Sequence, residues 1–181
     1  MLRRTKLIIA IFLGGAALAF LYLNQEVHHP PGAFKDAPNP VIKVGLKAPN
    51  ILLSDLKGEK RGLEQFQGKV LLINFWATWC PPCLIEMPSL AAVYNKFSKQ
   101  GFEILAINLD ENPKSARQFV EKNRLPFTVL LDPDGSAAQQ YLVYGLPYTV
   151  ILDREGKIRF KIFGSHEWDR GEAVEKIKAL L

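Results

Sequence analysis

"NFWATWCPPCLIEMP", residues 74–88, holds both cysteines of the 181-residue chain, Cys80 and Cys83, with two prolines between them. The apolar run "VLLINFWA", which begins at Val70, precedes them and is typical of a strand that is buried on both faces. After the cysteines, apolar residues recur at helical spacing until Gly101, which ends the pattern. The cysteines are therefore expected between a buried strand and the first turn of a helix.

The rest of the folded region alternates between strand and helix patterns. Strands are predicted at 102–109, 127–131, 148–153 and 157–163, and helices at 113–123, 136–141 and 168–181. This order predicts an α/β domain in which helices flank a mixed central sheet, with the last two strands paired as an antiparallel hairpin.

The spacing of Cys80 and Cys83 suits thiol–disulfide exchange. A helix N-terminus stabilises a thiolate through its free N–H groups and its dipole. Cys80 is expected to be the exposed nucleophile, and Cys83, one turn into the helix, the buried resolving thiol. Pro81 and Pro82 remove two backbone donors near the attacking sulfur, which favours the disulfide over the dithiol and predicts a reducing pair.

Other uses of the cysteine pair find less support in the sequence. A zinc site needs further Cys or His ligands, and covalent haem attachment needs His at the position of Leu84. A peroxidatic cysteine usually follows Thr by three positions, whereas Thr78 is two residues before Cys80. A structural disulfide across so short a loop stabilises little. A redox pair is therefore favoured, a structural disulfide and a metal clip stay open, and no cofactor is expected.

Residues 1–23 are predicted to form a membrane anchor. Three basic residues precede residues 7–23, which are 17 residues without a charge. As a helix, this segment spans about 25 Å, at the short end for a hydrocarbon core of about 30 Å. Its basic flank predicts a single-pass protein of the bacterial inner membrane, with a cytoplasmic N-terminus and a C-terminal domain in the periplasm or extracytoplasmic space. A signal peptide cleaved near residues 17–19 is the alternative.

Residues 24–43 contain four prolines and are predicted to be a spacer between this anchor and a redox domain at 44–181. The net charge of the chain is +5, of which +3 lies in residues 1–43. No concentrated basic patch for nucleic acid is expected in the remainder.

Three segments give the sequence a family resemblance: "GLKAPNILLSDLKG", "INFWATWCPPCLIEMP" and "YGLPYTVILDREGKI". Together with the apolar segment before them, they resemble the membrane-anchored thioredoxin-like proteins of the TlpA, ResA and CcmG (DsbE) group. The resemblance covers about residues 44–181. It implies a thioredoxin-like fold with an N-terminal β-hairpin and an internal helix–strand insertion at about residues 113–144.

The resemblance also implies roles for individual residues. Cys80 and Cys83 correspond to the redox-active disulfide, and Trp79 corresponds to an aromatic residue packed beside it. Pro147 corresponds to a cis-proline that faces the cysteines and engages the substrate backbone, together with its neighbour Leu146.

Glu86 corresponds to an acidic residue typical of this group, and helical spacing gives it an independent interpretation. It lies three residues after Cys83 on the same helix face, where a partly buried carboxyl group could take or give the Cys83 proton. A solvated surface charge is the alternative. Asn74 stands where thioredoxins carry an aspartate, and it cannot shuttle a proton. Trp168 is predicted to be a packing residue and His166 a surface loop residue.

The predicted function is the reduction of protein disulfides outside the cytoplasm. The resemblance implies a membrane thiol transporter of the DsbD or CcdA kind as electron donor. The expected substrates are the CxxCH disulfide of apocytochrome c, in cytochrome c maturation, or cysteines of a copper-delivery or oxidase subunit. A disulfide-introducing oxidant and a copper(I)-binding dithiol module are the alternatives, and nucleic acid is not an expected partner.

Overall fold

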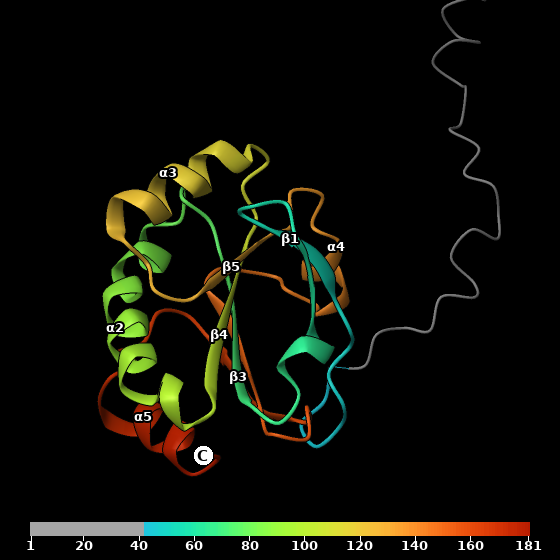
Figure 1. Cartoon of the computed structure of the whole chain (residues 1–181), viewed down its shortest axis with the longest axis vertical. Helices are drawn as coiled ribbons and strands as arrows, with labels where there is room; N and C mark the ends of the chain where they lie inside the picture. The colour runs from blue at the N-terminus through green and yellow to red at the C-terminus, as the bar shows by residue number, and fades with distance from the viewer. Residues whose placement is uncertain (1–41) are drawn as a thin grey trace, which may run out of the picture. The chain divides into compact units, whose positions relative to one another are not determined.

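The computed structural model describes residues 42–181 (Figure 1). The predicted anchor at 1–23 and nearly all of the predicted spacer at 24–43 lie outside the described residues. Among the helices that are described, none is long and apolar enough to cross a membrane. The structure therefore concerns the predicted redox domain.

A mixed sheet of seven strands forms the centre of this domain, in the order β2-β1-β5-β4-β3-β6-β7. The strands are β1 (Leu52–Asp55), β2 (Lys60–Gly62), β3 (Val70–Trp76), β4 (Phe102–Asn108), β5 (Thr128–Leu131), β6 (Tyr148–Leu152) and β7 (Ile158–Phe163). Strand β4 pairs in parallel with both β3 and β5, whereas the other neighbouring pairs are antiparallel. The mixed sheet predicted from the sequence is confirmed.

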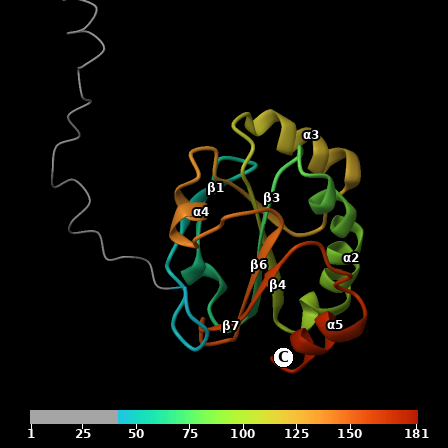
Figure 2. The same cartoon turned by 180° about the vertical axis from the view of Figure 1, so that it is seen from behind.

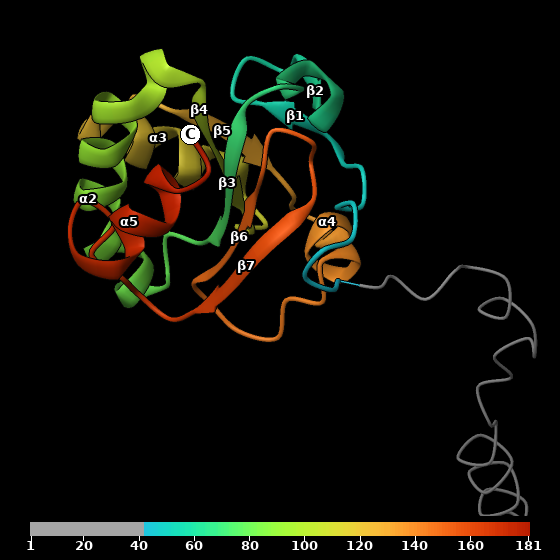
Figure 3. The same cartoon turned by 90° about the horizontal axis from the view of Figure 1, so that it is seen from below.

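Helices cover both faces of the sheet. The described helices are α2 (Pro81–Phe97), α3 (Pro113–Asn123), α4 (Ser136–Gln140) and α5 (Gly171–Lys178), with short 3₁₀ turns η1 (Leu63–Phe66) and η2 (Ser98–Gln100). Helices α2, α3 and α5 lie on one face, and α4 lies on the other (Figures 1 and 3). This three-layer arrangement is the one that the strand–helix order predicts.

Strand β3, which leads to the cysteines, is buried along its whole length. Leu72 and Trp76 pack in the apolar cluster that contains the inner faces of α2 and α5. Ile73 and Phe75 point the other way and pack in the cluster that contains α4. Because side chains alternate along a strand, the continuous apolar run serves both clusters at once.

Two features implied by the family resemblance are present. The N-terminal hairpin is β1–β2, and Asp55 holds its turn by accepting from the backbone N–H groups of Lys57 and Glu59, at 2.8 and 3.0 Å. The insertion contains α3, whose N-cap Asn112 accepts from the Lys114 N–H at 3.0 Å, and then β5. The insertion adds β5 to the sheet, and β5 joins the hairpin to the central strands.

The last helix is shorter than predicted. The sequence pattern predicts a helix at 168–181, but α5 runs only from Gly171 to Lys178. The Trp168 N–H donates to Ser89 Oγ of α2 at 3.2 Å, and the Trp168 indole is buried. Because Trp168 is held against α2 in this way, the segment before Gly171 follows α2 instead of starting the helix.

The hairpin of β6 and β7 forms one edge of the sheet (Figure 2). Arg154, in its turn, donates to the carbonyl oxygens of Gly68, Gln100 and Leu181 at 3.0, 3.1 and 2.6 Å. One guanidinium therefore joins the segment before β3, the end of η2 and the C-terminal residue, all at the end of the sheet where β3 begins.

Candidate active site

Cys80 and Cys83 form a disulfide at the start of α2, with their Cα atoms 5.3 Å apart. Cys80 is the N-cap residue, Pro81 and Pro82 occupy the first two helical positions, and the Cys83 N–H donates to Cys80 Sγ at 3.3 Å. Proline is tolerated there because the first N–H groups of a helix have no partner within the helix. The predicted junction of buried strand and helix start is confirmed.

The two sulfurs differ in exposure less than expected. Cys80 is only 5% exposed and Cys83 is fully buried. Cys80 is the more exposed of the two, as predicted, but the prediction of an exposed nucleophile is wrong for the disulfide state. In the disulfide, the Cys80 side chain turns back over the first turn of α2, where it meets the Cys83 N–H. Of the two cysteines, Cys80 is the one that keeps some exposed surface.

The segment just before Cys80 is fixed by Asp110, a buried residue that follows β4. Its carboxylate accepts from Thr78 N at 3.2 Å, from Thr78 Oγ1 at 2.9 Å and from Asn108 Nδ2 at 2.8 Å. Sequence reasoning missed this residue, since its partner Thr78 lies 32 positions away. The contacts hold the chain between β3 and Cys80 against the end of the neighbouring strand.

The Leu146–Pro147 peptide bond is cis, as the resemblance implies. Tyr148, the next residue, pairs with Phe75 near the end of β3, which places Pro147 at the same end of the sheet as the disulfide. Leu146 packs against the cluster that includes both cysteines. This loop therefore lies at the same end of the sheet as the cysteine pair, and the engagement of the substrate backbone by Leu146 and Pro147 stays a prediction.

Exposed apolar side chains gather at this end of the sheet. Trp79, beside the disulfide, is 67% exposed, so most of its indole faces solvent. Ile85 on α2, Tyr144 before Pro147 and Phe163 at the end of β7 are exposed as well. Since Phe163 pairs with Tyr148, the end of β7 also lies near the end of β3. Trp79 and Ile85, which flank the cysteine pair in the sequence, offer apolar contacts to a polypeptide that approaches Cys80. The Phe163 ring instead lies 4.5 Å from the Tyr148 ring, which packs in the cluster on the α4 face.

Glu86 lies inside the protein and accepts three hydrogen bonds. Asn74 Nδ2 donates to its Oε1 at 2.8 Å, and Trp168 Nε1 and the His166 N–H donate to its Oε2 at 2.9 and 3.2 Å. The residue is fully buried on α2, one turn after Cys83. The alternative of a solvated surface charge is wrong, because the side chain is enclosed by β3 and the segment before α5.

Burial raises the pKa of Glu86 above its ordinary value, because the charged carboxylate loses its hydration. The hydrogen bonds from Trp168, Asn74 and the His166 N–H act in the opposite direction, since they stabilise the charged form. The raised pKa shows that burial outweighs these bonds. A carboxyl group whose pKa is shifted toward neutrality is suited to accept and return a proton.

Asn74 occupies the position on β3 that faces this carboxyl group. Its Nδ2 also donates to Thr149 Oγ1 at 3.0 Å, while its Oδ1 is buried without a hydrogen-bond partner. An amide does not titrate, so the titratable group of this network is Glu86. The network links β3, α2 and β6 next to the disulfide.

Two donors to Glu86 escaped sequence reasoning. Trp168 is a packing residue as predicted, but its indole N–H also binds the carboxylate. The His166 ring is on the surface as predicted, whereas its backbone N–H binds Glu86. Both residues lie about 80 positions from Glu86, where helical or strand spacing carries no signal.

Within residues 42–181, no three Cys, His, Asp or Glu side chains converge as metal ligands.

Comparison with known proteins agrees with this site. The sequence pattern of the AhpC/TSA family matches residues 44–161. Thiol-disulfide oxidoreductase ResA of Bacillus cereus is 35% identical over 159 residues, 88% of this chain and 86% of that protein. ResA of Geobacillus kaustophilus is 39% identical over 124 residues, 68% of this chain and 71% of that protein.

Solved structures show the same fold. A structure from Chlorobium tepidum, assigned as the thiol:disulfide interchange protein DsbE, has a TM-score of 0.71 and 32% identity and covers 77% of this chain and 97% of its own. A thiol-disulfide oxidoreductase from Bacteroides fragilis has a TM-score of 0.66 and 31% identity and covers 75% and 100%. The chain belongs to the AhpC/TSA family and is, within it, a thioredoxin-fold thiol-disulfide oxidoreductase related to ResA and DsbE, a protein-disulfide reductase.

Proposed function

We propose that this chain is a membrane-anchored, extracytoplasmic reductant of protein disulfides in which Glu86 exchanges a proton with Cys83. The observation that carries the proposal is the buried Glu86 carboxyl group, held by three donors one turn along α2 from the disulfide. The two prolines support the reducing direction, because they take two donors away from the Cys80 thiolate. The uncharged segment 7–23 supports the location.

The first step is attack by the Cys80 thiolate on a sulfur of the substrate disulfide. An S–S bond forms between Cys80 and that sulfur, and the substrate S–S bond breaks. The other substrate sulfur leaves as a thiolate and takes a proton from water. The N-terminus of α2 stabilises the attacking thiolate, and the exposed Trp79 and Tyr144 contact the polypeptide around the disulfide.

The second step resolves the mixed disulfide. The Cys83 thiol gives its proton to Glu86, and the Cys83 thiolate attacks Cys80 Sγ. The Cys80–Cys83 disulfide forms, the Cys80–substrate S–S bond breaks, and the second substrate sulfur leaves as a thiolate that takes a proton from water. The substrate has then gained two electrons and two protons. Because Cys83 is fully buried, solvent reaches it poorly, and a neighbouring carboxyl group is the proton acceptor at hand.

A donor dithiol must then reduce the Cys80–Cys83 disulfide for the next cycle. The family resemblance supports a membrane thiol transporter of the DsbD or CcdA kind in this role. As substrates, it supports the oxidised CxxCH of apocytochrome c or the cysteines of a copper-delivery or oxidase subunit. A Cys83→Ser variant of the full chain leaves Cys80 in the mixed disulfide, so mass spectrometry of the trapped complexes identifies the substrate.

Replacement of Glu86 tests the proton transfer. We expect Glu86→Gln to slow the resolving step at pH 7 by about 100-fold, since it removes the proton acceptor, and to abolish the dependence of that step on the Glu86 pKa. Stopped-flow measurements of the reduction of a disulfide peptide between pH 5 and 9 give both quantities. Glu121→Gln, on the exposed part of α3, is the matched control. Equal rates and pH profiles in both variants would overturn the role of Glu86.

The direction of electron flow is tested by the equilibrium potential of the Cys80–Cys83 pair against glutathione. A reductant is expected near the value of thioredoxin, about −270 mV, whereas a value near about −120 mV marks a disulfide-introducing oxidant. Titration of the reduced protein with copper(I) tests the dithiol binding module. Carbonate extraction of membranes tests the anchor, since a cleaved and released product contradicts it.

A further inference from the structure

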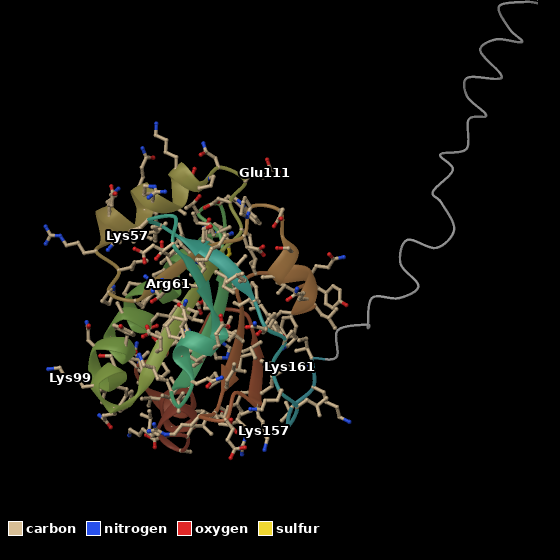
Figure 4. The ribbon with its side chains drawn as sticks, turned by 45° about the vertical axis from the view of Figure 1, so that its right-hand side comes forward. Lys57, Arg61, Lys99, Glu111, Lys157 and Lys161 are labelled. Carbon is tan, nitrogen blue, oxygen red and sulfur yellow. A yellow bond between two sulfur atoms is a disulfide. The ribbon has the colours of Figure 1, made fainter. Side chains whose placement is uncertain are left out.

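The start of the described chain and the last strand of the sheet together form a basic face. Lys47 faces Lys157 in an isolated antiparallel bridge, the Gly45 N–H donates to Ile158 O at 2.8 Å, and Lys161 Nζ donates to Ile42 O at 3.0 Å. Figure 4 shows Lys157 and Lys161 beside the segment where the described chain begins. We call this surface the basic face; its cations are Lys43, Lys47, Lys157, Arg159 and Lys161.

This face carries the whole net charge of the described domain. Residues 42–181 contain nineteen basic and sixteen acidic residues. The basic face holds five of the basic residues together with two acidic ones, Asp153 and Glu155, which pair with Arg159 and Lys157. The remaining fourteen basic and fourteen acidic residues cancel. The sequence hides this concentration, because the lysines come from two segments more than a hundred positions apart.

Apolar side chains stand among these cations. Val44 is 52% and Leu46 is 47% exposed, and both lie between Lys43 and Lys47. Exposed aliphatic side chains flanked by lysines suit the boundary between lipid headgroups and acyl chains, where the ammonium groups stay with the headgroups. A solvated charged surface does not call for such apolar neighbours.

The cavity next to this face does not account for its charge. A cavity of about 550 Å³ is lined by Lys47, Lys69 and Arg154, but also by Glu64, Asp153 and Glu155. The Arg154 guanidinium is already taken up by three carbonyl oxygens. The positive and negative side chains of the lining therefore balance, so the cavity does not favour an anionic ligand. The excess of positive charge lies on the basic face outside it.

We infer that the basic face rests on the anionic lipid surface of the membrane that holds the chain. The inference rests on the anchor of the proposed function. Residues 24–41, eighteen residues, separate the apolar segment from the face, and at no more than about 3.3 Å per residue they keep it within about 60 Å of the bilayer. At such a high effective concentration, even a weak attraction between lysines and anionic lipids orients the domain.

The contact determines which way the disulfide points. Lys157 lies at the end of the sheet where β3 begins, because Ile158 pairs with Leu152 and Leu152 with Leu71. Cys80 lies beyond the opposite end of β3. This strand has seven residues and is therefore about 23 Å long, at 3.3 Å per residue. With the basic face on the lipid, the disulfide is held on the side of the domain that points away from the bilayer.

Lysine labelling of the full chain in nanodiscs tests the inference. One set of nanodiscs contains phosphatidylcholine alone and the other contains one third phosphatidylglycerol. We expect acetylation of Lys43, Lys47, Lys157 and Lys161, followed residue by residue by mass spectrometry, to slow at least about threefold in the anionic discs. The difference is expected to vanish in 0.5 M NaCl, where the Debye length is short. Lys99, on another side of the domain in Figure 4, and Lys122 are internal controls and keep their rates.

Charge-reversed variants complete the test. The K43E/K161E chain is expected to lose the lipid-dependent protection of Lys47 and Lys157, whereas K99E/K122E, which has the same change of net charge, keeps it. Equal labelling in the two lipid compositions overturns the inference. If a soluble anionic protein protects these lysines, and does so only in neutral discs, the basic face binds a protein partner. That result also overturns the inference. Carbonate extraction and peptide reduction, measured on the same sample, show whether the anchor or the redox function has failed instead.

Discussion

At the scale of single residues, Glu86 and Asn74 form a pair whose hydrogen bonds depend on the protonation state of the carboxyl group. Asn74 Nδ2 donates to Glu86 Oε1 at 2.8 Å, as a carboxylate requires, while Asn74 Oδ1 has no partner. A rotation of the amide by about 180° places its oxygen where Glu86 and Thr149 both donate to it, once Glu86 carries a proton. Proton uptake therefore exchanges one set of hydrogen bonds for another, at the cost of moving the Asn74 amide nitrogen to the place where its oxygen now lacks a partner.

The same geometry predicts how Glu86 substitutions affect stability. In Glu86→Gln, the new carbonyl oxygen accepts from Trp168 and the His166 N–H, and the new amide donates to a rotated Asn74. The Asn74 amide nitrogen then lacks an acceptor, so the free energy of unfolding falls by about 1–2 kcal/mol. In Glu86→Ala, three donors lose their acceptor and the free energy of unfolding falls by about 3–5 kcal/mol. Urea unfolding followed by circular dichroism at pH 7 measures both. A Gln variant as unstable as the Ala variant contradicts the exchange of hydrogen bonds.

The pKa of Glu86 also predicts a pH dependence. Burial raises this pKa in the folded protein above the ordinary value of 4.5, so the unfolded chain releases the proton at lower pH than the folded one. The stability that Glu86 contributes is therefore fully present below about pH 4.5 and is lost as the pH rises through the folded pKa. Since Gln does not titrate, the free energy of unfolding of Glu86→Gln minus that of the native protein is expected to rise from pH 4.5 upward and then level off. Urea titrations between pH 4 and 8 check this, and a flat or falling difference contradicts it.

Local sequence predicted the chemistry of the site but not its enclosure. Cys80, Cys83 and Glu86 follow one another at intervals of three residues, so the motif itself predicts them, whereas the Pro147 loop came from the resemblance. Trp168 and His166 were placed correctly as packing and surface residues, yet their bonds to Glu86 depend on how the chain before α5 crosses α2. No local pattern encodes such a crossing.

At the scale of elements, the link between β3 and α2 is fixed by its neighbour β4. Asp110, at the end of β4, receives the Thr78 N–H and hydroxyl groups, and the Leu109 N–H donates to Trp76 O at 2.9 Å. Hydrogen bonds to the chain at the end of β4 therefore continue from Trp76, the last residue of β3, to Thr78. Cys80 enters helix α2 from a segment with little freedom.

Asp110 is expected to be more important for stability than its partner Thr78. Asp110→Ala leaves three buried or half-buried donors without an acceptor, which lowers the free energy of unfolding by about 2–4 kcal/mol. Thr78→Val removes only the hydroxyl bond and costs about 1 kcal/mol. Urea unfolding gives the free energies, and hydrogen exchange is expected to accelerate at residues 78–80 in Asp110→Ala. Glu121→Ala, on the exposed face of α3, is the control and is expected to change the free energy of unfolding little. If it lowers this free energy as much as Asp110→Ala does, the role of Asp110 is contradicted.

Element boundaries were predicted where the chain carries its own stop signals. Gly101, with φ of 86°, ends the run of α2 and η2, and Pro113 begins α3, because a left-handed glycine and a first-turn proline act locally. The start of α5 was wrong by three residues, since the apolar spacing of Trp168 reads as helical. Its side chain packs against another element instead.

At the scale of the whole molecule, the fold is stabilised by two apolar clusters on either face of the sheet, and the disulfide lies at the rim of one of them. The bond closes a separation of only three residues. A loop of that length removes little entropy from the unfolded chain. The cysteine pair is therefore free to open and close without the rest of the domain depending on it.

Removal of both sulfurs tests this independence. In Cys80→Ser/Cys83→Ser, we expect the free energy of unfolding to fall by about 2 kcal/mol from the lost loop closure, with an unchanged dependence on denaturant because the same surface is buried. Guanidinium unfolding followed by circular dichroism measures both quantities. The native protein under reducing conditions is the reference for the thiol state. A loss above about 5 kcal/mol means that the disulfide is structural, the alternative that the sequence left open.

The mixed sheet was predicted from the sequence, but the order of its strands was not. Strands β1, β2 and β5 have three or four residues each, too few to show a period, and the hairpin was known only through the family resemblance. Pairing of β5 with β1 joins residues about 77 positions apart. The basic face is hidden for the same reason, because it exists only where residues 43–47 meet β7.

The hydrogen bond from Trp168 to Glu86 also gives the molecule an optical readout. Trp168 is one of three tryptophans, and its indole N–H is bound to the carboxyl group that is proposed to gain a proton when Cys83 is oxidised. Indole emission responds to nearby charge, so we expect the fluorescence of the reduced and oxidised protein to differ in intensity. Each turnover is then visible in real time without a label, and a Trp168→Phe variant tells this signal apart from those of Trp76 and Trp79.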